Sequence, residues 1–178
     1  GFARACNVGA DAADKKYLIF LNSDTEVPED FFSIIAQKEI DIAGGFLVGK
    51  DGKPQFSCRR FPGFINFFFN RGSLFSKLLP GNRFTRSYLR TDNFHNQEIW
   101  VSGAAMIIRR IVFLMLNGFD EDFPLYMEDV DLCKRAIEAG YRVECLPELP
   151  IVHSEAGSTS LIQRRAVIER HISIWRYY

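Results

Sequence analysis

The fold of this chain is decided by residues 18–25, which read LIFLNSDT. With Tyr17, the apolar residues form a short continuous run that is typical of a strand buried on both faces in a parallel sheet. The polar residues that follow place Asp24 at the carboxyl edge of the sheet, where open α/β sheets bind ligands. A carboxylate there can hold a divalent cation against a phosphate. A simple turn aspartate is the alternative, because Asn, Ser, Asp and Thr all favour turns.

Strands and helices alternate outward from this stretch. Strands are predicted over 17–21, 42–48, 55–59 and 141–146, the last ending at Pro147, and residues 101–108 are predicted to form either a strand or a bend at Ser102 and Gly103 followed by a strand. Helices are predicted from Pro28 to about Lys38, over 110–116 and 128–139, and beyond Leu161. Residues 61–98 have no clean period, so we expect a short helix and a long loop there, of the kind that forms lids or binding segments. The alternation predicts an α/β fold.

Length and composition indicate one domain of an ordinary globular protein. The chain has 178 residues, of which 47% are apolar and 25% are charged, which excludes a disordered tail, a fibre and a multi-span membrane protein. The 22 basic and 22 acidic residues give a formal net charge of zero, so we expect no nucleic-acid partner. The four cysteines form no C-x-x-C pair, and we expect them to be reduced, in a cytosolic protein.

A second signal is the acidic sequence GFDEDF at 118–123, followed by YMEDVDL at 126–132. The carboxylates crowd the first turn of a predicted helix, where the macrodipole stabilises their anionic forms and mutual repulsion and burial oppose it. Helix capping alone explains one or two acids, but it does not explain the flanking Phe123 and Tyr126. A carboxylate here that faces a cleft can act as a general base.

A third signal is His153, which ends the apolar sequence PIV. Alone it would be an ordinary core or surface histidine, but both His153 and Asp24 end apolar strands. We therefore expect the two side chains to converge and share one Mg²⁺ or Mn²⁺. Phosphatases of the haloacid-dehalogenase type use a similar D-x-D-x-T signature, but Asn22 stands at the nucleophile position and argues against that chemistry.

An ordered set of motifs carries a resemblance to a known family. The matching stretches are GFARACNVG at 1–9, LNSDT at 21–25, VSGAAM at 101–106, GFDE at 118–121, YMEDVDL at 126–132 and VH at 152–153. Together they resemble family 2 glycosyltransferases of the GT-A fold, and especially the bacterial rhamnosyltransferase-like branch. The match runs over nearly the whole chain.

The resemblance implies a role for each matching residue. Asp24 matches the last acid of the D-x-D-like metal motif, and His153 matches the C-terminal metal-binding histidine. Asp129 matches the catalytic base, with Glu128 beside it. Arg4 and Asn7 match a segment near the nucleotide, whereas Trp100, Gly103 and Ala104 match the wall between donor sugar and acceptor. The implied substrate-binding residues are Arg4, Asn7, Asn22, Ser23, Trp100, Gly103 and Ala104.

The resemblance also sets an expectation for the domain. The family begins with a strand, a helix and a strand that bind the nucleotide base, all before the GFARACN stretch. We therefore expect residues 1–178 to form a single partial GT-A catalytic domain without that portion. The expected architecture is a three-layer sandwich with a mostly parallel sheet whose first strands are missing. We expect the chain alone to be inactive as an enzyme.

The resemblance implies metal-dependent, inverting transfer of a sugar from a nucleotide-diphosphate sugar. For the rhamnosyltransferase-like branch, the implied donor is dTDP-rhamnose. The acceptor would be a saccharide or a lipid-linked saccharide, and the protein cytoplasmic or peripheral at the inner membrane face. Aromatic residues and arginines in 61–90 and after Leu161 either pack under a loop or face such a lipid-linked acceptor. A non-catalytic fragment and a metal-dependent phosphohydrolase are the alternatives.

Overall fold

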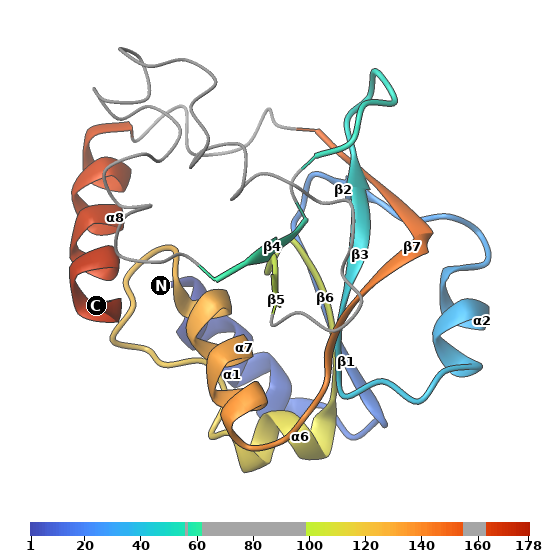
Figure 1. Ribbon diagram of the computed structural model, residues 1–178, viewed down its shortest axis with the longest axis horizontal. Coiled ribbons are helices and arrows are strands. Elements are labelled where there is room, and N and C mark those ends of the chain that lie inside the picture. The colour runs from blue at the N-terminus through green and yellow to red at the C-terminus, as the bar shows by residue number, and fades with distance from the viewer. Residues whose placement is uncertain (56, 62–98, 155–162) are drawn as a thin grey trace.

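The computed structural model describes residues 1–55, 57–61, 99–154 and 163–178, which form a three-layer α/β arrangement (Figure 1). A five-stranded sheet has the order β1-β6-β3-β7-β2. Its strands are β1 (Tyr17–Leu21), β2 (Thr25–Glu26), β3 (Ile42–Val48), β6 (Ala105–Arg109) and β7 (Val143–His153). A separate two-stranded sheet pairs β4 (Cys58–Arg60) with β5 (Ile99–Val101).

The main sheet is mixed. Strand β6 is antiparallel to both β1 and β3, β3 is parallel to β7, and β2 is antiparallel to β7. Strands β1, β3 and β7 therefore run in one direction, and their carboxyl ends lie at the edge where β6 begins. This edge is the one that the sequence predicts to bind a ligand.

Helices cover both faces of the sheet. Helices α1 (Phe2–Ala12), α6 (Arg110–Met115) and α7 (Glu128–Glu138) lie on one side, and α2 (Phe31–Ala36) lies on the other (Figure 1). Each face has its own apolar core: Leu132 of α7 belongs to one, and Phe31 of α2 to the other. Burial of such side chains is the main stabilising term of the fold.

Helix α8 (Gln163–Tyr177) docks beside α7. The Ser173 hydroxyl donates a hydrogen bond to the Leu125 carbonyl over 2.8 Å, and Arg176 pairs with Asp122. Lys134 of α7 lies over the Tyr177 ring. The helix is thus held against the loop that leads into α7.

Several elements differ from the sequence predictions. The helix predicted from Pro28 begins only at Phe31, because residues 28–30 form a turn, and α1 was not predicted at all. The strand predicted to end at Pro147 continues to His153. It does so because a register shift opposite Gly45 and Phe46 takes up Pro147 before pairing resumes at Pro150.

The cysteine prediction is wrong for two residues. Cys58 of β4 and Cys145 of β7 form a disulfide, whereas Cys6 and Cys133 are free. The strands bring Cα atoms that are 87 residues apart in sequence to 6.2 Å, within the usual range for a disulfide. Sequence spacing could not show this pairing.

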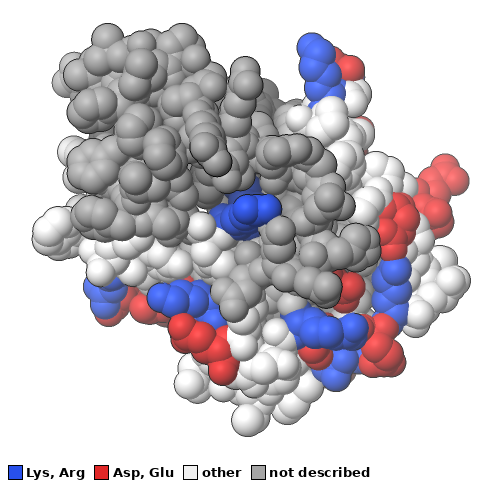
Figure 2. All heavy atoms as spheres, viewed as in Figure 1, with Lys and Arg blue, Asp and Glu red and all other residues white. Residues whose placement is uncertain are grey.

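The described surface carries charges of both signs. Figure 2 shows basic and acidic side chains interspersed over the described part of one face. Among the described residues, no helix is both long enough and apolar enough to span a membrane. Phe64, Phe67, Phe68 and the rest of 62–98 lie outside the described residues.

Candidate functional site

Three chain segments meet at the carboxyl edge of the sheet. The segment after β1 contacts the turn before β6, because the Asn22 amide donates to the Ala104 carbonyl over 3.0 Å. It also contacts the end of β7, because the Ser154 amide donates to the Asp24 carbonyl over 2.9 Å and Thr25 pairs with His153. The edge therefore gathers residues that are far apart in the sequence.

Asp24 and His153 point toward each other at this edge. The Asp24 Oδ1 atom lies 3.4 Å from His153 Nε2, and both side chains are partly buried. The two atoms are close enough to bind one divalent ion, whose ligand bonds are about 2–2.6 Å long. The expected convergence is thus present in the geometry, and metal binding itself stays a prediction.

Gln55 holds the imidazole of His153 in place. Its Oε1 lies 2.8 Å from His153 Nδ1, and its Nε2 donates to the His153 carbonyl over 3.0 Å. A proton on Nδ1 would donate to Gln55 and leave the Nε2 lone pair facing Asp24, as in metal-binding histidines. Sequence reasoning missed Gln55, which has no motif around it. No group of three or more metal-ligating side chains occurs among the residues that the structure describes.

The acidic start of α7 lies against the turn before β6. Tyr126 and Met127 both have positive φ values, 66° and 73°, which is uncommon for residues other than glycine. Asp129 then directs its carboxylate at the turn: Oδ2 accepts from the Gly103 amide and Oδ1 from the Val130 amide, each over 2.9 Å. Two backbone donors thus fix the orientation of this carboxylate.

Burial changes the acidity of both carboxyl groups at the start of α7. Burial, and to a smaller extent the charge of the neighbouring Asp129, raise the pKa of Glu128 to about 8. Burial also raises the pKa of Asp129, while the hydrogen bonds from Gly103 and Val130 and the charge of Arg59 oppose the shift. A carboxylate with a raised pKa is better matched to taking a proton near neutral pH.

The turn at Gly103 and Ala104 joins the two parts of the site. Gly103 binds the Asp129 carboxylate, and Ala104 accepts from the Asn22 amide. Asn22 is two residues before Asp24. The arrangement places a fixed carboxylate and a carboxylate–imidazole pair along one sheet edge, as proton transfer beside a bound cation requires.

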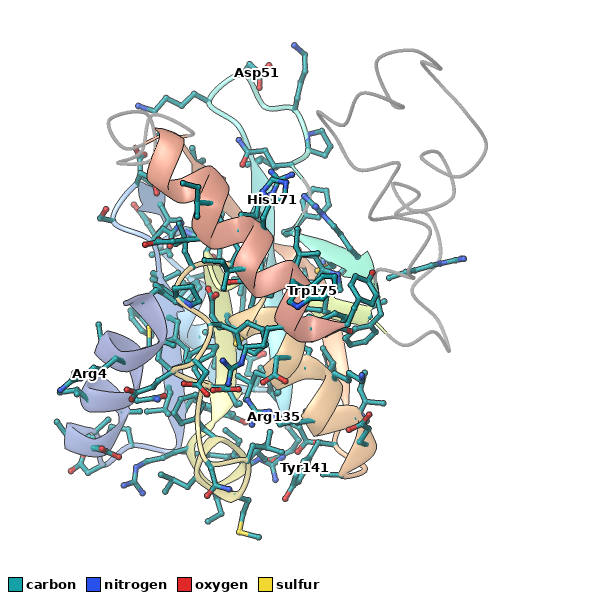
Figure 3. All side chains as sticks on the ribbon, turned by 90° about the vertical axis from the view of Figure 1, so that its left-hand side faces the viewer. Arg4, Asp51, Arg135, Tyr141, His171 and Trp175 are labelled. Carbon is teal, nitrogen blue, oxygen red and sulfur yellow. A yellow bond between two sulfur atoms is a disulfide. The ribbon has the colours of Figure 1, made fainter. Side chains whose placement is uncertain are left out.

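The other predicted substrate residues lie around this edge in different environments. Gly103 and Ala104 are buried in the turn, Asn22 is half-buried and Ser23 is exposed. Arg4 is exposed on α1, where Figure 3 shows it on the outer side of the helix. Whether any of them contacts a substrate stays a prediction.

Asn7 has a structural task. Its Nδ2 donates to the Phe119 carbonyl and its Oδ1 accepts from the Phe119 amide, each over 2.9 Å. This pair of hydrogen bonds joins α1 to the segment between α6 and α7. Its predicted place near a nucleotide remains a prediction.

Trp100 adjoins a basic residue that sequence reasoning missed. Its Nε1 donates to the Arg60 carbonyl over 3.0 Å, and the Arg59 guanidinium lies 5.5 Å from the centre of its ring. The charge of Arg59 also acts on Asp129. The strand pairing of Arg59 with Trp100 could have been found only with the register of β4 and β5.

Comparison with known proteins identifies relatives of this chain. The N-acetylglucosaminyl-diphospho-decaprenol L-rhamnosyltransferase of Mycobacterium tuberculosis is 34% identical over 65% of this chain and 38% of its own length. Rhamnosyltransferase WbbL of Escherichia coli K12 is 27% identical over 79% of this chain and 53% of its length. The O-antigen biosynthesis protein RfbC of Myxococcus xanthus is 30% identical over 97% of this chain and 13% of its length.

A solved structure matches the fold. GalNAc-T7, crystallised with UDP, GalNAc and Mn²⁺, superposes with a TM-score of 0.56 over 86% of this chain and 30% of its own, at 16% sequence identity. No family model matches the chain. The chain spans less than two thirds of the length of each of these three curated relatives. The structural match confirms the GT-A fold that the motifs predicted.

Proposed function

Because the chain is a homologue of bacterial rhamnosyltransferases and has a GT-A fold, we propose that it acts in an inverting family 2 glycosyltransferase. The proposed donor is a nucleotide-diphosphate sugar, dTDP-rhamnose. The proposed acceptor is a saccharide or lipid-linked saccharide, in keeping with the diphospho-decaprenol in the name of the mycobacterial relative. The products would be the extended saccharide and the nucleoside diphosphate.

One observation supports the proposal most strongly: the Asp24–His153 pair lies at the carboxyl edge of the sheet, and Asp129 binds the turn before β6 at the same edge. Asp129 is bound to Gly103, and the adjacent Ala104 is bound to Asn22. A transferase needs a base for the acceptor hydroxyl beside a site that neutralises the leaving diphosphate. The edge has a candidate for each task.

The donor set of Asp24 and His153 fits Mg²⁺ or Mn²⁺. It consists of one carboxylate oxygen, which suits both ions, and one imidazole nitrogen 3.4 Å away, which as a ligand of transition metals suits Mn²⁺ better than Mg²⁺. Diphosphate oxygens and water would complete the coordination. When bound, the ion would supply Lewis-acid stabilisation of the leaving diphosphate.

Asp129 is our candidate for the general base. The Gly103 and Val130 amides hold its carboxylate, which would accept the proton of the acceptor hydroxyl during attack on the anomeric carbon. Attack opposite the leaving group inverts that centre. General-base help of this kind contributes roughly 10²–10⁴ in rate.

The test is a transfer assay on the complete gene product with labelled dTDP-rhamnose. Asp129→Asn should lower the transfer rate by roughly 10²–10⁴ and spare donor binding, because the amide has nearly the same shape but accepts no proton. Glu138→Gln, exposed at the other end of the same helix, is the matched control. Near-normal transfer by Asp129→Asn would remove it from the base role. Phosphate release without sugar transfer would favour the phosphohydrolase.

We further propose a cytoplasmic protein that touches the inner membrane face through α8. Ile168, Ile172 and Trp175 follow helical spacing and are exposed, Trp175 to 84%, while Ser173 on another side of the helix is buried against Leu125. Figure 3 looks onto this helix. Exposed Trp and Ile side chains suit the headgroup region of a bilayer, where a lipid-linked acceptor would lie.

Vesicle flotation tests this contact. The protein should float with anionic vesicles, and Trp175→Ala should reduce the floated fraction. The control is Phe32→Ala, which removes an exposed aromatic residue from α2. Equal flotation of both variants and the parent, or no flotation at all, would contradict the membrane contact.

A further inference from the structure

The two adjacent carboxyl groups at the start of α7 have very different surroundings. Asp129 accepts hydrogen bonds from the Gly103 and Val130 amides, and the charge of Arg59 from β4 acts on it. Glu128 is only 6% exposed, and its Oε2 has no hydrogen-bond partner among the residues that the structure describes. Two backbone donors and the charge of Arg59 thus offset part of the cost of a buried negative charge on Asp129, whereas the offset for Glu128 is a hydrogen bond from its own backbone.

Among the described residues, no positive charge contributes to the pKa shift of Glu128. From α1, the Cys6 thiol faces it, and burial together with Glu128 raises the pKa of that thiol to about 11, so Cys6 stays neutral. From α7 itself, the charged neighbour is Asp129, whose charge has the same sign. A buried carboxylate without a cation or a full set of donors is costly, so the neutral acid is favoured.

The turn before α7 brings Glu128 into this position. Tyr126 and Met127 both have left-handed backbone conformations, with φ values of 66° and 73°. Conformations of this kind cost about 1–3 kcal/mol for residues other than glycine and gather at functional sites. Helix α7 starts immediately after them, with Glu128 directed inward and Asp129 toward the turn before β6.

Resting on the function proposed above, we propose that Glu128 is a positioning residue that keeps its proton at neutral pH and thereby confines the single negative charge of the pair to Asp129. As a neutral acid, Glu128 adds no second charge beside the base. Asp129 is then the one ionised carboxylate that can accept the proton of the acceptor hydroxyl. Ionisation of Glu128 would place two negative charges side by side in a buried site and disturb the orientation of Asp129.

The protonation state can be measured directly in this chain, without any transfer reaction. The infrared spectrum in D₂O at neutral pH should contain the carbonyl band of a protonated carboxylic acid. Glu128→Gln, which has nearly the shape of the neutral acid, should remove the band. Glu138→Gln, exposed on the same helix, should keep it. A parent spectrum without the band at neutral pH, or a band that survives in Glu128→Gln, would overturn the proposal.

Thermal unfolding gives a second readout. A pKa raised from 4.5 to about 8 means that the folded chain binds more protons than the unfolded chain between these values, so stability falls as pH rises through that range. The melting temperature of the parent should therefore drop relative to that of Glu128→Gln as the pH increases from 4.5 to about 8. A constant difference across this range would show a merely structural role.

The transfer assay then separates this proposal from the function itself. In an active enzyme, the alkaline limb of the pH–rate profile should move to higher pH in Glu128→Gln. If the infrared band shows a protonated Glu128 but no sugar transfer is detected, the proposed transferase function is refuted and the protonation state still stands. An active enzyme whose alkaline limb is the same in parent and variant would overturn the positioning role.

Discussion

Asn7→Ala would separate a structural role of this residue from the substrate role that its motif implies. The Asn7 amide makes two hydrogen bonds of 2.9 Å to the backbone of Phe119, which lies 112 residues away in sequence. Phe119 is buried and its ring contacts the rings of Phe2, Phe20 and Phe113. Alanine would leave the amide and the carbonyl of this buried residue without their partners.

The expected loss follows from the two unsatisfied backbone groups. Each costs about 1–3 kcal/mol when buried, and the partial exposure of Asn7 lets water compensate in part. We therefore expect the free energy of unfolding to fall by about 2–4 kcal/mol. If the unfolding free energy falls by about 2 kcal/mol per M of urea, the urea concentration at the unfolding midpoint would decrease by about 1–2 M.

Urea unfolding followed by circular dichroism measures this shift. Val8→Ala is the matched control, because Val8 is the next residue of α1 and is 62% exposed. The unfolding free energy of Val8→Ala should lie within about 0.5 kcal/mol of that of the parent. An Asn7→Ala midpoint equal to that of the parent, with loss of nucleotide binding, would refute the structural reasoning and favour the substrate role.

Three further changes test contacts around the site. Reduction of the Cys58–Cys145 disulfide, which closes a separation of 87 residues, should lower the unfolding free energy by about 2–5 kcal/mol; equal urea midpoints with and without reductant would contradict this. Gly118→Ala should cost about 1–3 kcal/mol, because Gly118 has a φ of 68° and a Cβ there would lie 2.6 Å from Asn7 Oδ1; an unchanged melting temperature would argue against the described turn. Ser173→Ala should cost about 1 kcal/mol by removing the hydrogen bond to the Leu125 carbonyl, and faster amide hydrogen exchange in α8 should accompany it. If the amides of α8 exchange at the same rate in Ser173→Ala and in the parent, other contacts hold α8 in place.

Local patterns predicted most of the sheet and the positions of the candidate site residues on it. The apolar run at 17–21 and the one at 42–48 became β1 and β3, and the acidic helix begins at Glu128 as expected. The convergence of Asp24 and His153 was also predictable, because β1 and β7 run in one direction and residues at their carboxyl ends lie at one sheet edge.

Contacts between distant segments were not predictable from those patterns. The hydrogen bonds of Asn7 to Phe119, the disulfide of Cys58 with Cys145 and the hold of Gln55 on His153 each depend on the register of the folded chain. The extension of β7 beyond Pro147 was missed for a related reason. A proline normally ends strand pairing, and only the bulge opposite Gly45 and Phe46 allows the strand to continue.

The proposed function depends on Asp24 and His153 forming a divalent-cation site at the carboxyl edge of the sheet. Electron paramagnetic resonance of Mn²⁺ titrated into the chain, with and without dTDP, tests it most directly. We expect that the parent binds Mn²⁺, that dTDP strengthens the binding, and that Asp24→Asn and His153→Gln each weaken it at least tenfold. Glu29→Gln, which changes an exposed acid five residues after Asp24, should bind as the parent does. Equal Mn²⁺ binding by the parent, Asp24→Asn and His153→Gln would contradict the claim.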